Sequence, residues 1–264
     1  MISTSALLAI AALAIGILGA AHWRARQEIE RLRKHGEATA RNLESLQTSF
    51  ARFVPSEVIE RVITSGVSTS GERKDVTVLF ADLVGFTALS ENMEPAELVE
   101  VMNGYFERMS RAVKKHRGHV STFLGDGVLA FFGALQPNPW QANNGAQAAL
   151  AMRRELEEYN VELRDRGLPA LAVGIGLHRG SGVAGLVGSH DLLQFAFVGR
   201  VVNTAARVQD LTRTCDADIL ITEAVRQDMD PRFVLRAMAP ASLRGIEKPV
   251  ATYAVEQFEE RSSV

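Results

Sequence analysis

Two strand-length runs that each lead to an aspartate constrain this chain most. Residues 76–81 are β-branched or apolar and are followed at once by Asp82 and a glycine-containing bend. Residues 119–124 alternate polar and apolar side chains, and a Gly-Asp-Gly turn centred on Asp126 joins them to a returning apolar run. We therefore expect a β-sheet that carries Asp82 at its rim and Asp126 at a hairpin tip.

Two carboxylates on adjacent strand ends suit a divalent metal ion. Mg²⁺ is a hard ion that prefers oxygen ligands and usually binds one or two carboxylates plus substrate phosphates. Two such ions can clamp an attacking and a leaving oxygen. A single aspartate after a strand is more often a turn former or a helix cap, so Asp82 and Asp126 need support from elsewhere in the chain.

A second polar pair lies nearer the C-terminus. Residues 195–207 run from a strand through a glycine into an amphipathic helix that carries Asn203 and Arg207, four positions apart. On a helix the two share a face, and an amide donor beside a guanidinium suits a sugar oxygen and a pentavalent phosphate. Taken alone, such a pair is most often a solvated helix face.

Together these segments resemble the class III nucleotidyl cyclases of the bacterial membrane-anchored type, whose catalytic domain makes cyclic AMP or cyclic GMP from the nucleoside triphosphate. The resemblance spans about residues 72–256. The segments on which the resemblance rests are VTVLFADLVGFT (76–87), FLGDG (123–127), GIGLHRGSGVAGLVGS (174–189) and FAFVGRVVNTAARV (195–208). It implies a phosphorus–oxygen lyase with an α+β, ferredoxin-like class III cyclase sandwich.

The resemblance also assigns roles to residues. The two metal-binding aspartates fall on Asp82 and Asp126, with the Leu83 carbonyl as a backbone ligand, for two Mg²⁺ or Mn²⁺ ions in each active site. The transition-state asparagine and arginine fall on Asn203 and Arg207. In this family the metals and the Asn/Arg pair come from opposite subunits, so the resemblance implies a head-to-tail homodimer with two complete sites.

Further positions are expected to bind the substrate. The backbone N–H groups of Gly85, Phe86 and Thr87, at the start of a helix, are suited to phosphates. The family's triphosphate-binding lysine falls in the segment 242–249, where the alignment allows Arg244 or Lys248 and Arg244 ranks first.

The base-contacting positions depart from the family pattern. The adenine-contacting lysine of many members is Thr122 here, and its usual Asp or Thr partner is Ala196. Thr122 offers one hydrogen bond and the Ala196 side chain offers none, so side chains alone do not choose between ATP and GTP. The leading interpretation is an adenylyl cyclase that converts ATP to cyclic AMP and pyrophosphate. The alternatives are a guanylyl or dual-specificity cyclase and a degenerate nucleotide-binding regulatory domain.

Composition narrows the function classes. The formal net charge of the 264-residue chain is −2 with 23% charged residues, so no basic field indicates a nucleic-acid partner. The lone Cys215 excludes an intramolecular disulfide framework.

The N-terminal region predicts a membrane anchor. Residues 1–23 contain no charged side chain, and residues 6–21 are nearly all Ala, Leu and Ile, which favours a transmembrane helix; a cleaved signal peptide is the alternative. Basic residues follow the apolar stretch and none precedes it. The positive-inside rule then predicts a single-pass protein of the inner or cell membrane with a cytoplasmic catalytic domain.

A coiled-coil linker is expected over residues 24–54. Apolar residues recur there at heptad spacing, which favours parallel two-helix pairing, although one helix packed along its own domain is the alternative. A lead-in helix and loop (55–71), the catalytic domain (72–258) and a tail (259–264) follow. The seam positions are Ile29, Leu32, Gly36, Thr39, Leu43, Leu46, Phe50 and Phe53.

Within the catalytic domain, alternating helix and strand patterns predict helices on one face of a largely antiparallel sheet. His178, beside two glycines, is interpreted as structural because no carboxylate or second histidine stands at ligand spacing. The expected helices are 95–116, 139–165 and 200–211, and the expected strands are 75–81, 119–124, 128–132, 171–178, 193–198, 218–221, 233–236 and 251–256.

Overall fold

The computed structural model describes residues 71–189, 193–246 and 248–259, with separate positions between 23 and 36. The chain divides into two compact units, residues 1–66 and 67–264. In the first unit the described positions are helical and exposed. The expected membrane anchor, most of the coiled-coil linker, nearly all of the lead-in segment and most of the tail lie outside the described residues. Among the helices that can be described, none is long and apolar enough to cross a membrane.

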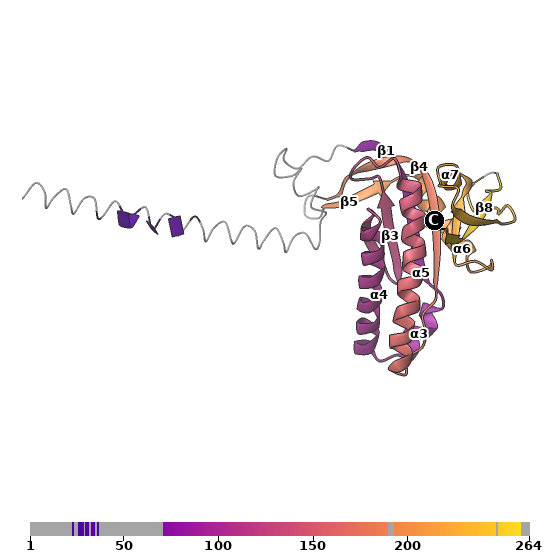
Figure 1. Ribbon diagram of the computed structural model, residues 1–264, viewed down its shortest axis with the longest axis horizontal. Coiled ribbons are helices and arrows are strands. Elements are labelled where there is room, and N and C mark those ends of the chain that lie inside the picture. Colours follow the sequence, from indigo (N-terminus) through magenta and orange to yellow (C-terminus); the bar gives the residue numbers. More distant parts are fainter. Residues whose placement is uncertain are drawn as a thin grey trace, which may run out of the picture. The chain divides into compact units, whose positions relative to one another are not determined.

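The second unit is built on one eight-stranded sheet (Figure 1). Its strands follow the order β2-β3-β1-β4-β6-β8-β7, and β5 pairs with β4 off this path. All neighbours are antiparallel except β4 and β6, which are parallel. The strands are β1 (Glu72–Leu83), β2 (His119–Leu124), β3 (Gly127–Phe132), β4 (Val173–Gly188), β5 (Leu193–Val198), β6 (Ile219–Thr222), β7 (Phe233–Ala237) and β8 (Thr252–Phe258).

The first half of the unit has the predicted ferredoxin-like plan. Its chain order is β1, two helices, the β2–β3 hairpin, one long helix and β4, and β1 lies between β3 and β4. The helices of the unit are α3 (Phe86–Asn92), α4 (Pro95–Lys115), α5 (Gln141–Asp165), α6 (Arg200–Leu211) and α7 (Glu223–Arg226). The three long predicted helices are therefore confirmed to within two residues at each end.

Helices cover both faces of this sheet, so the expectation of helices on one face was wrong. Leu79 and Ala81 of β1 pack into the core beneath α4 and α5. The alternate residues Val76 and Val78 pack with Val201 of α6 on the opposite face. Successive side chains of a strand point to opposite faces, so an apolar β1 requires a layer on each side.

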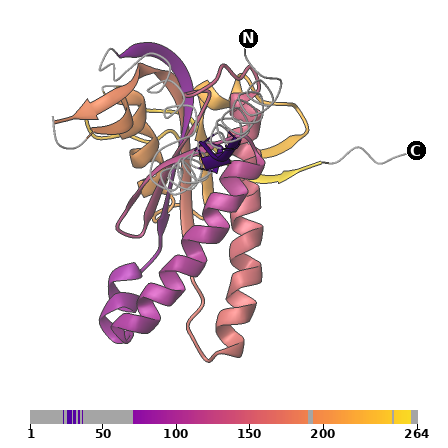
Figure 2. The same cartoon turned by 90° about the vertical axis from the view of Figure 1, so that its left-hand side faces the viewer.

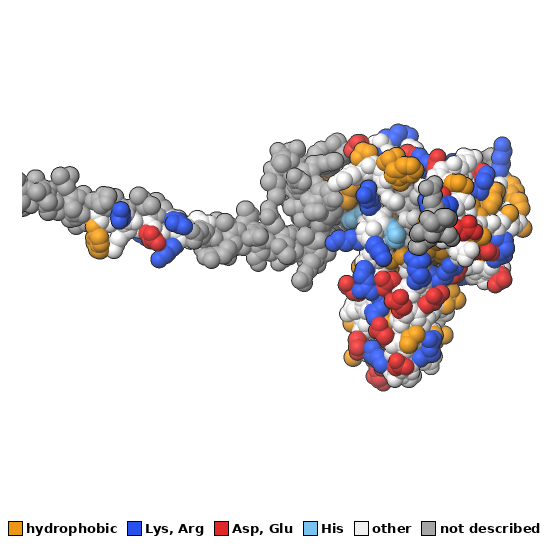
Figure 3. Space-filling model, viewed as in Figure 1, with side chains coloured by type: hydrophobic (Ala, Val, Ile, Leu, Met, Phe, Trp, Pro, Cys, Tyr) orange, Lys and Arg blue, Asp and Glu red, His pale blue; other side chains and the backbone are white. Residues whose placement is uncertain are grey.

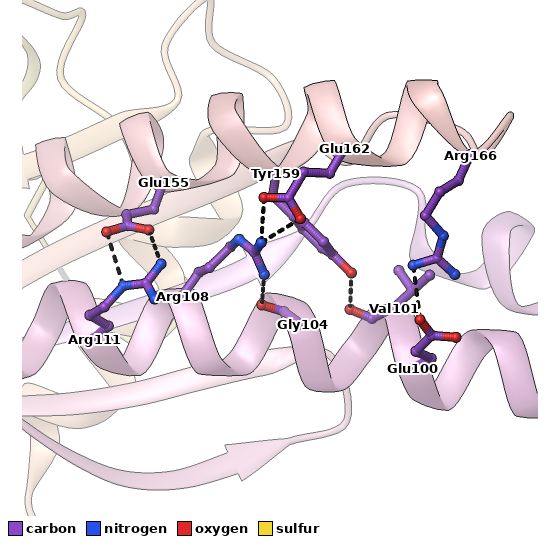
Figure 4. Close-up of polar contacts among 9 residues, drawn as sticks. All are labelled: Glu100, Val101, Gly104, Arg108, Arg111, Glu155, Tyr159, Glu162 and Arg166. Atoms are coloured by element: carbon purple, nitrogen blue, oxygen red, sulfur yellow. Dashed lines mark hydrogen bonds and ion pairs between the residues drawn. The ribbon is translucent and has the colours of Figure 1, made fainter.

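Charged pairs join α4 and α5 on their outer surface (Figure 4). The Arg108 guanidinium donates to both carboxylate oxygens of Glu162 at 2.6 Å and lies 4.0 Å above the Tyr159 ring centroid. Arg111 donates to Glu155 from two nitrogens, with Nε 3.2 Å from one carboxylate oxygen and Nη2 2.5 Å from the other. Basic and acidic side chains accordingly alternate over these helices (Figure 3).

Strand β4 and the short helix α7 differ most from the sequence prediction. Strand β4 has 16 residues and continues far beyond position 178, because its second half forms a hairpin with β5. That hairpin leads away from α4 and α5, as the orange β5 arrow shows (Figure 2). The short helix α7, of four residues, was not predicted, because one helical turn is too short for a periodic pattern to emerge.

Candidate active site

Asp82 lies near the C-terminal end of β1, on the face that α6 covers. Its register partner on β4 is Gly174, and a Cβ atom on Gly174 would lie 3.1 Å from Nε2 of Gln209 in α6. The glycine thus allows the end of α6 to approach the sheet closely beside Asp82. The side chain of Asp82 is only 18% exposed. Leu83, the next residue, is buried and its backbone pairs with Val173.

Asp126 is brought to the same place by the β2–β3 hairpin. Strand β3 pairs with β1 so that Ala81 faces Val128, and the turn therefore lies beside Asp82. A Cβ atom on Gly127 would be 3.3 Å from Oδ1 of Asp82. Gly125 has a φ of 63°, a left-handed conformation that glycine adopts without strain. The structure thus brings together the two predicted metal-binding aspartates.

The two carboxylates repel one another. Burial raises the pKa of Asp82 above its ordinary value, the negative charge of Asp126 raises it further, and Arg213 opposes both effects. Two partly desolvated carboxylates that need a nearby positive charge have the donor set and the charge that a hard divalent cation requires. The residues therefore fit the expected metal. Within the described part of the chain, no group of three or more His, Cys, Asp or Glu side chains gathers at one point.

The positive charge beside Asp82 comes from a residue that sequence reasoning missed. Arg213 follows α6, and its Nη2 lies 2.5 Å from Oδ2 of Asp82. The two residues are 131 positions apart, and no local pattern marks such a contact.

Tyr105 of α4 is a second residue that the sequence did not indicate. Its side chain is fully buried, and its hydroxyl has no hydrogen-bond partner among the described residues. Burial raises the Tyr105 pKa most, and the charges of Asp82 and Asp126 add to the increase. The field of the two carboxylates therefore reaches into the helical layer.

Asn203 and Arg207 lie on α6, but not on the side of the helix that meets the sheet. The buried side of α6 consists of Val201, Thr204, Ala205, Val208 and Gln209. Asn203 is exposed and Arg207 is half-buried. The predicted pair thus shares a face, as expected from its spacing, and that face is directed away from the strand that carries Asp82.

The C-terminal segment approaches this outer face of α6. Gly245 has a φ of 71°, and a Cβ atom there would lie 3.4 Å from Nη1 of Arg207. Arg244, the first-ranked triphosphate ligand, precedes this contact and is exposed; Lys248 is exposed as well. The structure therefore gathers Arg207 and the predicted triphosphate segment in one region.

The predicted phosphate-binding residues stand directly after β1. Gly85 has a left-handed φ of 74° and precedes α3, which begins at Phe86. Gly85 and Thr87 are exposed and Phe86 is half-buried. The short segment from Asp82 to Thr87 thus carries a metal ligand and the expected phosphate donors.

The two base-contacting positions lie on β2 and β5. The rings of His119 on β2 and Phe195 on β5 have centroids 6.4 Å apart, so these two strands, which are not paired in the sheet, approach each other at this point. The Thr122 hydroxyl donates to the Phe123 carbonyl at 3.3 Å, and Ala196 pairs with Gly185. Neither position presents a charged group to a base.

Known proteins are similar to this chain in sequence and in fold. The adenylate cyclase of Anabaena cylindrica is 31% identical over 219 residues, which are 79% of this chain and 43% of that protein. Adenylate cyclase 1 of Rhizobium meliloti (strain 1021) is 31% identical over 209 residues, 78% of this chain and 31% of that protein. This chain therefore spans less than half the length of either relative.

Two solved structures of cyclases are similar to this chain in fold. The guanylyl cyclase Cya2 matches with a TM-score of 0.66 and 31% identity, over 72% of this chain and 96% of that one. The adenylyl cyclase CyaB from P. aeruginosa matches with a TM-score of 0.69 and 27% identity, over 74% and 100%. The family model for the adenylate and guanylate cyclase catalytic domain matches residues 68–257. With its paired strand-end aspartates and its Asn/Arg helix, the chain belongs to the adenylate and guanylate cyclase catalytic domain family.

Proposed function

We propose that this protein is an adenylyl cyclase that converts ATP to 3′,5′-cyclic AMP and pyrophosphate, working as a homodimer with two divalent metal ions in each site. The observation that carries the proposal is the meeting of Asp82 and Asp126 at one end of the sheet, where burial and the negative charge of Asp126 raise the pKa of Asp82. Two such carboxylates, partly removed from water, form a metal site rather than a solvated surface.

Asp82, Asp126 and the Leu83 carbonyl would hold the two Mg²⁺ or Mn²⁺ ions. Such ions would supply Lewis-acid chemistry, which lowers the pKa of a 3′-hydroxyl and neutralises charge on a triphosphate. The backbone N–H groups of Gly85, Phe86 and Thr87 orient the phosphates. Asn203 and Arg207 donate hydrogen bonds to the pentavalent phosphorus centre, where negative charge increases in the transition state. Arg244 binds the end of the triphosphate, with Lys248 as the alternative.

The orientation of α6 supports a site shared between two subunits. Asn203 and Arg207 are directed away from the face on which Asp82 lies, so one chain does not direct both sets of groups at one substrate. A head-to-tail pair of chains brings the outer face of one α6 to the aspartates of the other, and twofold symmetry then makes two equal sites.

ATP is favoured as substrate because both relatives named above are adenylate cyclases. The structural neighbour Cya2 is a guanylyl cyclase, which makes dual specificity the second candidate. Thr122 and Ala196 favour neither base strongly, since no charged or amide side chain stands at either position.

We further propose that residues 1–23 anchor the protein in the cell membrane, with the catalytic domain in the cytoplasm. The apolar run followed by basic residues supports this orientation. The heptad pattern of residues 24–54 then supplies a linker that pairs two catalytic domains.

The test is an assay of the purified full chain with ATP and with GTP, each with Mg²⁺ and with Mn²⁺. We expect cyclic AMP from the wild type, and a loss of at least about a hundredfold in kcat for Asp82→Ala and Asp126→Ala. Asp165→Ala is the matched control, because Asp165 is an exposed aspartate at the end of α5, outside the proposed site, and is expected to be dispensable. Near-wild-type turnover in either of the first two variants would remove the metal assignment.

A further inference from the structure

One ion pair lies in the proposed metal site. The guanidinium of Arg213 binds Asp82, with 2.5 Å between Nη2 and Oδ2. The Asp82 side chain is 18% exposed, whereas the Glu223 and Glu256 partners of two other exposed arginines are 33% and 46% exposed. The contact is therefore better shielded from solvent than an ordinary surface pair, and shielding strengthens it.

The Arg213 guanidinium and a divalent cation compete for the carboxylate oxygens of Asp82. A carboxylate has two oxygens with about four lone-pair sites, and a guanidinium on Oδ2 takes part of that capacity. Two positive charges within a few ångströms also repel one another. Arg213 and a metal ion on Asp82 therefore oppose each other.

Arg213 can leave without disturbing the fold. Its own side chain is 50% exposed, so it reaches Asp82 from the solvent side. Its backbone N–H donates to the Asp210 carbonyl at 3.2 Å, which keeps the turn in place while the side chain rotates. A rotamer change of one long side chain is thus sufficient to free Oδ2.

We propose that Arg213 is an internal counter-ion of the metal site, which neutralises Asp82 in the metal-free enzyme and must be displaced from Oδ2 when metal binds. This rests on the proposed function of Asp82 as a metal ligand. Metal binding is then an exchange of cations, and its affinity is set partly by the strength of the Arg213 contact. The same contact prevents two bare carboxylates from facing one another before metal arrives.

The experiment is calorimetric titration of Mn²⁺ alone, without nucleotide, into the full chain. Removing the competitor in Arg213→Gln should tighten the Mn²⁺ Kd by roughly three- to tenfold, the range of a partly shielded ion pair. Arg213→Lys keeps the charge and should bind Mn²⁺ much as the wild type does. Arg226→Gln is the matched control, because it breaks an exposed arginine–glutamate pair and should leave the Kd unchanged.

Thermal unfolding gives a second readout. In the presence of a chelator, Arg213→Gln should melt at a lower temperature than the wild type, since Asp82 and Asp126 then face each other without a counter-ion. Saturating Mn²⁺ should raise its melting temperature by more than it raises that of the wild type. A circular dichroism spectrum like that of the wild type shows that the variant is folded.

Equal or weaker Mn²⁺ affinity in folded Arg213→Gln would overturn the exchange, the weaker case meaning that Arg213 orients Asp82 for the metal. Detectable Mn²⁺ binding by Arg213→Gln but not by the wild type would support the exchange. Asp126→Asn separates this idea from the proposed function: if it leaves the wild-type Mn²⁺ affinity unchanged, the metal site itself is wrong. If it abolishes binding while Arg213→Gln changes nothing, only the exchange fails.

Discussion

Gly245 leaves room for one Cβ atom beside the guanidinium of Arg207, since a Cβ atom on the glycine would lie 3.4 Å from Nη1, an ordinary contact distance. The residue that is expected to stabilise the transition state is thus next to a position without a side chain. A longer side chain at position 245 would extend toward the guanidinium and displace it, and catalysis is sensitive to the placement of such groups. Gly245 is therefore expected to keep the space that Arg207 needs.

Replacing Gly245 should affect catalysis more than folding. Gly245→Leu and Gly167→Leu carry a similar backbone cost of about 1 kcal/mol, because the two glycines have φ values of 71° and 75°. Only the side chain at 245 meets Arg207, since nothing lies within 4 Å of a Cβ at 167. We expect kcat to fall about tenfold in Gly245→Leu and to remain near wild type in Gly167→Leu. Equal kcat in the two variants would show that the contact has no catalytic role.

The division of the site between two subunits predicts complementation. Asp82→Ala and Arg207→Ala should each be inactive alone, and their mixture should contain heterodimers with one intact site. Twofold symmetry limits recovery to about half of the wild-type activity per heterodimer. Mixing Asp82→Ala with Asp126→Ala is the control, because both lesions fall in the same half-site and no intact site results. If activity does not return although labelled subunits exchange, the site lies within one chain.

Base discrimination should be weak. Thr122 can rotate its hydroxyl to suit adenine or guanine, and Ala196 supplies no polar side-chain atom. One hydrogen bond contributes on the order of 1 kcal/mol, about five- to tenfold in rate. We expect a modest preference for ATP in kcat/KM, and a sharper one in the double variant Thr122→Lys with Ala196→Asp. A preference for ATP above roughly a thousandfold in the unmodified enzyme would mean that another residue reads the base.

His178 should make stability depend on pH. Burial lowers the His178 pKa from 6.5 to about 4, and Nδ1 lies 2.9 Å from the Thr222 hydroxyl oxygen. Between these pH values the unfolded chain holds the proton and the folded chain does not, so stability falls as pH falls from 6.5 toward 4. The loss amounts to at most about 3 kcal/mol. Urea midpoints measured across this range should vary less in His178→Gln, and an unchanged pH dependence would exclude this histidine as its source.

Local patterns determined much of the fold and predicted the residues of the candidate site that lie close together in sequence. The extended run before Asp82 and the Gly-Asp-Gly turn each specify a strand end, and β1 and the β2–β3 hairpin form as predicted. The spacing of Asn203 and Arg207 placed them on one helical face. These features depend on periodicity over a few residues, which a sequence displays directly. The succession of apolar residues along β1 also carried an unused signal, because a strand that is apolar on both sides must be covered on both faces.

Long-range packing decided the rest. Arg213 contacts Asp82 although the two residues are 131 positions apart in the sequence. The contact forms because glycines of β4 allow α6 to approach the sheet closely, so that the end of α6 lies beside β1. The same packing buries one side of α6 and leaves Asn203 and Arg207 on the other, away from the aspartates of their own chain. The sequence by itself therefore predicted which residues carry the chemistry. Only the tertiary structure decided which of them can meet within one chain, because that depends on how closely helix and sheet pack.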